Sequence, residues 1–110
     1  MTDTDRIKRL AEWMGWTWCP AGSAFWNDKS LKYERDWNPL TRDQDALMLA
    51  DRAIEEEWEF RLESNRAAGQ SPWHAFFWQR RKHLHGEGKT RSAAIVAAIE
   101  QLMEGTHDHD

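Results

Sequence analysis

The chain has 110 residues, of which 15 are basic and 19 acidic, giving a net charge of −4. This length suits one domain, the negative charge disfavours a general nucleic-acid coat, and no apolar run approaches the roughly 18 residues that a membrane span needs. The single cysteine, Cys19, excludes an intramolecular disulfide framework and a multi-cysteine zinc site. Because Met1–Arg6 carries acids and no apolar segment follows it, we expect no signal peptide and a cytoplasmic location in a bacterial cell.

The first third of the chain predicts a helix followed by a hairpin. Apolar residues recur at spacings of three and four over Thr4–Met14, which is typical of an amphipathic helix, and Gly15 stands where such a helix would end. Alternation then predicts strands over Trp16–Cys19 and Ala24–Asn27, joined by a turn. The pattern also allows a short third strand over Leu31–Arg35, which we leave out of the element order.

The rest of the chain predicts two further helices and two strands. Asn38-Pro39 breaks the preceding element, and Thr41 is a good N-cap. The predicted elements are a helix over Thr41–Glu57, a strand over Trp58–Glu63, a loop over Asn65–Ser71, a strand over Trp73–Arg80, a polar connection over Arg81–Lys89 and a helix from Thr90 to Gly105. Since the second of these strands is dense in aromatic residues, we expect both of its faces to be covered.

These elements indicate an α+β fold in the order α-β-β-α-β-β-α. We expect a small, mostly antiparallel sheet flanked by helices, an αβα sandwich, in one domain over residues 1–105 with a flexible tail at 106–110.

The sequence shows no catalytic constellation. Cys19 has no histidine or lysine near it in sequence, and the serines lack nucleophile-elbow spacing. Gly86–Thr90 ends like a phosphate-binding loop and opens a helix, but His83 stands where that motif requires its first glycine. Backbone N–H groups and nearby cations at this helix start could hold an anion, although a loop with a capped helix behind it accounts for the same residues. We expect no enzymatic activity and no cofactor.

A basic run, Arg80–His85, follows the aromatic strand. Aromatic faces beside cations suit stacked bases and a phosphate backbone, whereas a core strand ending in solvated charges explains the same composition. The candidate binding residues on this segment and on the following helix start are Trp73, Trp78, Arg80, Arg81, His83, Lys89 and Arg91.

The histidines raise the question of a metal. His83 and His85 are two residues apart, and the terminus His107–Asp110 alternates histidine with aspartate. Such a tail can coordinate divalent ions, but nothing fixes its geometry, so we interpret it as a disordered terminus and expect no metal site.

Eight tryptophans remain to be explained. They are too many for every indole to be buried in so small a protein, and exposed tryptophans mark binding surfaces. Some of them should line a groove or a subunit interface.

Several segments resemble the phage ABA sandwich domain family over roughly Asp5 to Met103. They are Ala11–Trp16 with its Met-Gly-Trp, the hairpin Phe25–Asp28, the turn Asp36–Thr41, and the closing Ala93–Ala98 behind Lys89-Thr90. The resemblance implies a helix–sheet–helix sandwich in a small protein of a bacteriophage or prophage, without catalysis. It also implies that Trp16, Trp37 and Pro39 are fold markers. The aromatic strand and the basic run depart from the family pattern.

The leading hypothesis is therefore a non-catalytic phage or prophage accessory protein that binds a host protein, with counter-defence as one role, or another phage protein. The alternatives are nucleotide or single-stranded nucleic-acid binding through tryptophans and Arg80–Arg91, and a structural homo-oligomer. We expect no membrane partner.

Overall fold

The computed structural model describes residues 2–64 and 72–105 and confirms the α+β class, with three α-helices and two three-stranded antiparallel sheets in that part of the chain. The chain groups into two compact units, Met1–Asn38 and Pro39–Asp110. The single domain over 1–105 stays a prediction. The loop expected at 65–71 and the tail expected at 106–110 lie outside the described residues.

The N-terminal unit contains one helix and a three-stranded meander. Its elements are α1 (Asp3–Trp13), β1 (Thr17–Cys19), a short 3-10 helix (Pro20–Gly22), β2 (Ala24–Asn27) and β3 (Lys32–Arg35). β3, which the predicted order leaves out, pairs with β2 along its length. The helix begins earlier than predicted because Thr2 is its N-cap: the Thr2 hydroxyl accepts from the backbone N–H of Asp5, and the Asp5 carboxylate accepts from the backbone N–H of Thr2.

Aromatic rings make up much of the core of this unit. Trp16 and Trp37 are 6% and 5% exposed, and their ring centroids lie 4.8 Å apart in an edge-to-face contact. Phe25 adds a second edge-to-face contact with Trp37 at 6.1 Å. Such pairs prefer this geometry because the positive ring edge meets the negative ring face. Two of the tryptophans thus stabilise the hydrophobic interior of a unit with few aliphatic residues.

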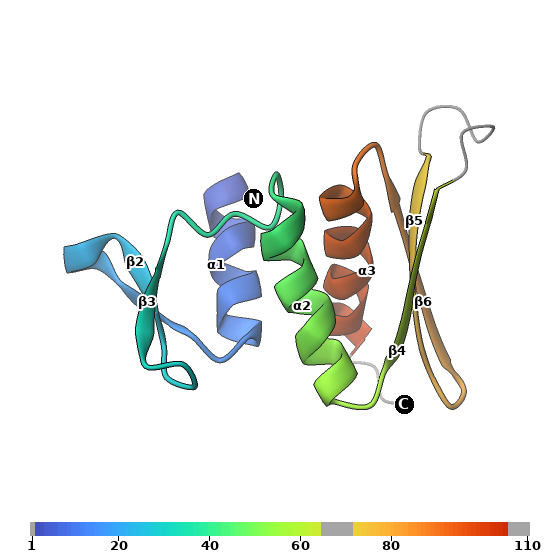
Figure 1. Cartoon of the computed structure of the whole chain (residues 1–110), viewed down its shortest axis with the longest axis horizontal. Coiled ribbons are helices and arrows are strands. Elements are labelled where there is room, and N and C mark those ends of the chain that lie inside the picture. Colours follow the sequence, from blue (N-terminus) through green and yellow to red (C-terminus); the bar gives the residue numbers. More distant parts are fainter. Residues whose placement is uncertain (1, 65–71, 106–110) are drawn as a thin grey trace. The chain divides into compact units, whose positions relative to one another are not determined.

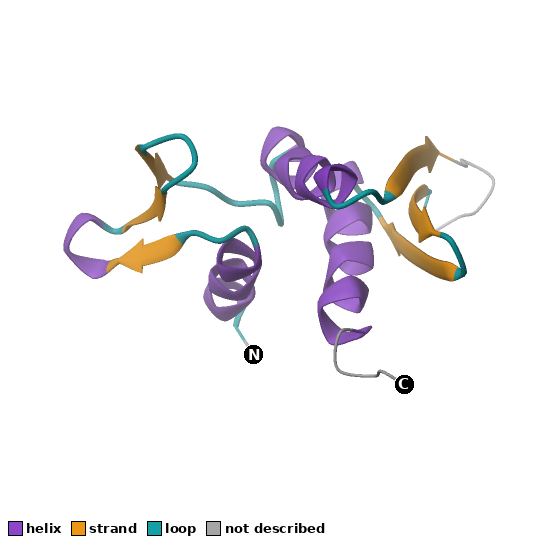
Figure 2. Cartoon of the chain, turned by 90° about the horizontal axis from the view of Figure 1, so that it is seen from below, coloured by secondary structure: helices purple, strands orange, loops and turns teal. Residues whose placement is uncertain are grey.

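The C-terminal unit has its two helices on one face of its sheet (Figures 1 and 2). Its elements are α2 (Asp43–Glu55), β4 (Glu59–Ser64), β5 (Trp73–Gln79), β6 (Lys82–Gly88) and α3 (Arg91–Gly105), with strand order β4-β5-β6. α3 lies directly on β5 and β6, and α2 packs against α3. No helix among residues 2–64 and 72–105 is both long and apolar enough to cross a membrane.

The polar connection predicted over Arg81–Lys89 is wrong, because most of this segment is strand β6. By alternation, four positions of β6 share the side of α3: Lys82, Leu84, Gly86 and Gly88. Two of them lack a side chain and a third is lysine, so the usual apolar alternation is hidden.

These two glycines allow α3 to lie against the strand. A Cβ atom on Gly86 would collide with the backbone carbonyl oxygen of Ala94 and the backbone nitrogen of Ala98, and one on Gly88 would lie 2.6 Å from the Cβ of Ala93. The two glycines of the Gly-Glu-Gly-Lys-Thr pattern are therefore explained by close packing of a helix on a strand.

The starts of the two helices are joined by side-chain contacts. Thr90 caps α3 as predicted, since its hydroxyl accepts from the backbone N–H of Ala93 at 3.1 Å. The predicted cap at Thr41 is wrong: Arg42 is the N-cap of α2, without a side-chain hydrogen bond. Asp43 in the first turn instead accepts from the backbone N–H of Ser92 at 3.3 Å and pairs with Arg91 at 3.2 Å.

Candidate functional site

The sheet of the C-terminal unit has a covered face and an open face. Successive side chains of a strand point to opposite sides, so Ala75 and Phe77 of β5 are fully buried on the side of α3, while Phe76 and Trp78 are only partly buried. The prediction that both faces of this strand are covered is wrong. The open face consists of Glu59, Arg61 and Glu63 of β4, His74, Phe76 and Trp78 of β5, and His83, His85 and Glu87 of β6.

Strand register arranges the open face in three rows, each with a ring from β5 at its centre. The rows are Glu59–Trp78–His83, Arg61–Phe76–His85 and Glu63–His74–Glu87. The guanidinium of Arg61 lies over the rings of Phe76 and Trp78, 5.7 and 5.9 Å from their centroids, and also pairs with Glu63 at 2.7 Å. The open face therefore presents aromatic rings bordered by polar and charged groups.

A hollow of about 360 Å³ opens at the first two rows. Its lining residues are aromatic, basic or imidazole side chains, with no carboxylate among them: Arg61, Phe76, Trp78, Arg80, Arg81, Lys82 and His83. The volume lies at the lower end of the range of small-molecule sites. Its composition suits a ligand that is both planar and anionic.

The cations of this hollow come mainly from the β5–β6 turn. Gln79 pairs with Lys82 across the two strands, so Arg80 and Arg81 form the connection. Arg80 has a φ of +53°, in the left-handed region that disfavours most residues carrying a Cβ atom. Within residues 2–64 and 72–105, neither arginine forms an ion pair.

A second hollow, of about 670 Å³, adjoins the same turn and has acidic walls. Glu56, Glu57 and Glu59 line it together with the side chains of the turn. The Gln79 side-chain amide donates to the backbone carbonyl of Glu56 at 2.8 Å, which ties the end of β5 to the segment before β4. The turn thus lies between an acid-free hollow and an acidic one.

The predicted binding residues do not form one site. Trp78, Arg80, Arg81 and His83 come together at the acid-free hollow. Trp73 points to the covered side, where the Arg91 guanidinium lies 4.6 Å from its ring centroid. Lys89 is exposed between β6 and α3.

Arg61 and Phe76 line the hollow but are not among the predicted binding residues, and Lys82 was predicted only as part of the basic segment Arg80–Arg91. Phe76 shares the side of Trp78 by simple alternation, which was available from the sequence. Arg61 reaches the same place only through the β4–β5 register.

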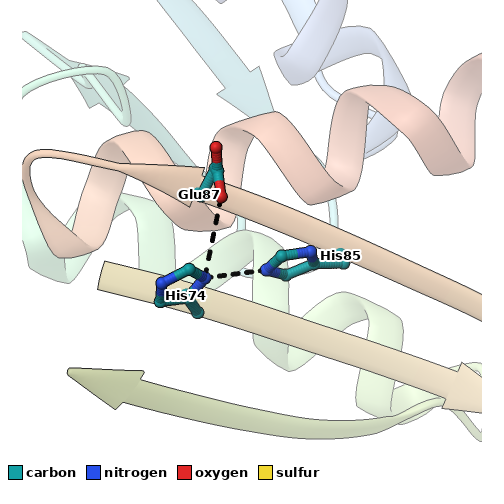
Figure 3. Close-up of side chains that lie close together, drawn as sticks. All are labelled: His74, His85 and Glu87. Carbon is teal, nitrogen blue, oxygen red and sulfur yellow. Dashed lines mark hydrogen bonds and ion pairs between the residues drawn. The ribbon is translucent and has the colours of Figure 1, made fainter. Parts of the chain in front are cut away.

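Three potential metal ligands meet at the other end of the open face. His74, His85 and Glu87 bring their ligand atoms within 4.8 Å of one another (Figure 3). The histidine spacing considered in the sequence paired His85 with His83, but His83 instead lies beside Trp78, with ring centroids 6.5 Å apart.

Comparisons with protein-family models, with curated proteins and with solved structures each give no match. The resemblance to the phage ABA sandwich domain family therefore stays a prediction. Any function has to be argued from the geometry of the chain itself.

Proposed function

We propose that this chain is a non-catalytic binding protein that holds single-stranded nucleic acid on the open face of its β4–β5–β6 sheet. The observation that carries the proposal is the acid-free hollow, in which two aromatic rings and four positively charged side chains line one space. Base–aromatic stacking and backbone cations are the two features that sequence-independent single-strand binders combine.

Stacking is the first supporting argument. Trp78 and Phe76 are next to each other on the same side of β5, which is the central strand, and each keeps part of its ring exposed. Same-side neighbours along a strand are about 6.6 Å apart. Because the Arg61 guanidinium lies over both rings and His85 stacks on Phe76, Trp78 is the ring that would take a base, with the Arg61 side chain turning toward a phosphate. A base stacked on such a ring contributes about 1–3 kcal/mol.

Charge is the second argument. The net charge of −4 opposes binding at long range, but screening limits its reach to about 8 Å at physiological salt. Within the hollow, Arg80 and Arg81 have no ion-pair partner among the described residues, so contact with phosphate would break no existing pair at either side chain.

A fluorescence titration tests the proposal. Oligothymidylate, which does not fold on itself, is added to the full chain at low salt; we expect quenching of tryptophan emission and an affinity that falls as salt rises. The R81Q variant should reduce the slope of log affinity against log salt by about 0.7, the value for one phosphate contact on a single strand.

Two matched controls locate the binding. W78F should lose most of the quenching, whereas W73F should keep it, because Trp73 lies under Arg91 on the covered side. K32Q removes one charge from the other unit and should leave the salt slope unchanged. Emission that does not respond at low salt, or equal effects of R81Q and K32Q, would contradict the proposal.

A protein partner is the second candidate, and the acidic hollow favours it. Carboxylates of Glu56, Glu57 and Glu59 beside the arginines of the turn give a mixed-charge surface of the kind that protein interfaces match. The family resemblance implies a phage or prophage accessory protein, for which a host protein is the expected target.

Native mass spectrometry separates this candidate from nucleic-acid binding. A co-purified protein that is lost from E57Q/E59Q but kept by W78F would support a protein partner. A clean multiple of the chain mass, with neither ligand nor partner, would instead indicate the homo-oligomer.

A further inference from the structure

Two histidines and a glutamate from neighbouring strands converge on the open face, away from the acid-free hollow. His74 Nδ1 lies 2.8 Å from His85 Nε2 and 3.9 Å from the nearer carboxylate oxygen of Glu87 (Figure 3). Register explains the meeting: His74 is directly opposite Glu87, and His85 is the diagonal neighbour on the same side of β6.

We propose that His74, His85 and Glu87 form a binding site for a divalent transition-metal ion, with Zn²⁺ as the ion best suited to it. The inference does not rest on the proposed function, because none of the three residues lines the hollow that carries that function.

The donor atoms nearly have the spacing that zinc requires. With bonds of 2.0–2.1 Å in tetrahedral geometry, two ligand atoms lie about 3.3 Å apart. The observed separations of 2.8 and 3.9 Å fall on either side of that value, and all three ligand atoms lie within 4.8 Å of one another, so metal binding requires the His85 and Glu87 side chains to adjust. A set of two imidazole nitrogens and one carboxylate oxygen is an established zinc donor set that leaves a fourth position for water or an external ligand.

Ring stacking holds the ligands in place before a metal binds. The His85 ring contacts both Phe76 and His74, with centroid separations of 4.7 and 5.1 Å and interplanar angles of 6° and 13°, and the Phe76 and His74 centroids lie 6.3 Å apart. The His74 side chain is only 18% exposed, and both strands belong to the hydrogen-bonded sheet. Little side-chain entropy therefore remains to be lost at the two histidines when a metal binds, whereas the exposed Glu87 side chain has still to be ordered.

The contact between the imidazoles is one that a metal can replace. Two ring nitrogens 2.8 Å apart share one proton, which one ring donates and the other accepts. Zn²⁺ would take the lone pairs of both nitrogens, and the proton between them would pass to the other nitrogen of the ring that carried it, so that both imidazoles stay neutral. The carboxylate of Glu87 would offset part of the charge of the ion. Because Glu87 is exposed to solvent, water can reach the fourth coordination position.

The test is a zinc titration of the full chain carrying H107A and H109A, which removes the histidines of the tail. We expect one Zn²⁺ per chain in competition with a chromophoric chelator, and a rise in Tm with added zinc. H74A and H85A, each in this background, should lose more than the roughly 100-fold that removal of an outer-shell partner costs. E87Q, which keeps a weaker oxygen donor, should lose less.

His83 provides the matched control, since it lies on the same side of β6, two residues before His85. H83A should bind zinc as tightly as the background chain, and far-UV circular dichroism checks that every variant is folded. H74N and H85N, which keep a polar side chain of smaller reach, should lose zinc as H74A and H85A do and serve if an alanine variant fails to fold. Failure of the background chain to take up zinc, or equal losses in H83A and H85A, overturns the proposal, and either result leaves the nucleic-acid titration unaffected.

Discussion

The two units of the chain use tryptophan in different ways. In Met1–Asn38, Trp16 and Trp37 are buried against each other and supply much of the core. In Pro39–Asp110, the core is built mainly from alanine and aliphatic residues of α2 and α3 with Phe77, and one tryptophan, Trp58, is buried in it at 5% exposure. Trp78 is left on the open face of the sheet. Tryptophan therefore supplies much of the core of one unit, whereas the other unit buries one tryptophan and leaves another available for binding.

The difference follows from what each sheet packs against. Close packing of α3 on β5 and β6 requires small residues at the contact, and Gly86, Ala75 and Ala94 meet that requirement. The rings of Phe76 and Trp78 lie on the other side of β5, away from α3. A tryptophan count thus indicates neither a core nor a binding surface until the faces of the strands are known.

The largest expected effect is a contrast in stability between two tryptophan truncations. W16A should destabilise the N-terminal unit by about 3–5 kcal/mol, the usual cost of removing a large buried aromatic side chain. W78A should cost about 1 kcal/mol or less, because its ring is partly exposed. Urea unfolding followed by amide NMR signals of each unit measures both, and equal losses would remove the contrast.

A second prediction concerns the close approach of α3. G86A should destabilise the C-terminal unit by about 3 kcal/mol, since the new methyl group would meet helix backbone and not a side chain that can rotate away. G22A is the control: nothing lies within 4 Å of the added Cβ, so stability of the N-terminal unit should stay nearly unchanged. Thermal unfolding of both variants decides the matter, and an intact Tm for G86A would contradict the packing argument.

A smaller effect is expected where the helix starts of the C-terminal unit meet. D43A removes the acceptor for the Ser92 N–H and the partner of Arg91, which should cost about 1 kcal/mol. D43N keeps an oxygen acceptor and should lose less. D51A is the control: it also replaces an aspartate of α2 by alanine, with the same gain in helix propensity, but on the exposed side, where none of these contacts is lost. Chemical denaturation ranks the three, and D43A no less stable than D51A would show that the contact contributes nothing.

The smallest effect concerns the start of α1. The side chain of Thr2, and then its backbone N–H, hold the pKa of the Asp5 carboxyl below its usual value. Because the pKa is lowered in the folded state, Asp5 adds stability above its unfolded-state pKa, and this stability disappears as the pH falls through the folded-state pKa. D5N should therefore show a flatter acid dependence of N-terminal unit stability than the parent chain. Acid titrations of D5N and the parent chain, followed by circular dichroism, measure this difference. The same pH dependence in both chains would contradict the prediction.

Much of the fold was predictable because local patterns carry it. Residues close in sequence determine three of the predicted features: the apolar face of helix α3, the strand β2 and the N-cap at Thr90. β6 could not be found in this way, because glycine at 86 and 88 replaces the apolar residues that mark a strand, and the reason for those glycines lies in the helix packed against them.

The candidate site divides along the same line. Arg80 and Arg81 of the β5–β6 turn are adjacent in sequence, so the basic run of the sequence was enough to predict them as candidate binding residues. Arg61 joins them through strand register, and His74 meets His85 from eleven residues away. Contacts of this kind can be predicted only when the pairing of the strands is known. Because β6 was not predicted as a strand, its pairing with β5 could not be predicted either.

The backbone at Arg80 has a consequence for engineering the chain. A left-handed conformation brings Cβ too close to the following carbonyl oxygen and costs most residues other than glycine about 1–2 kcal/mol, and asparagine tolerates it better. R80N should therefore make the hairpin more stable while removing one of the cations that would contact phosphate. A selection for thermostability alone would favour this substitution, and a selection for ligand retention would reject it, so stability and affinity oppose each other at one position.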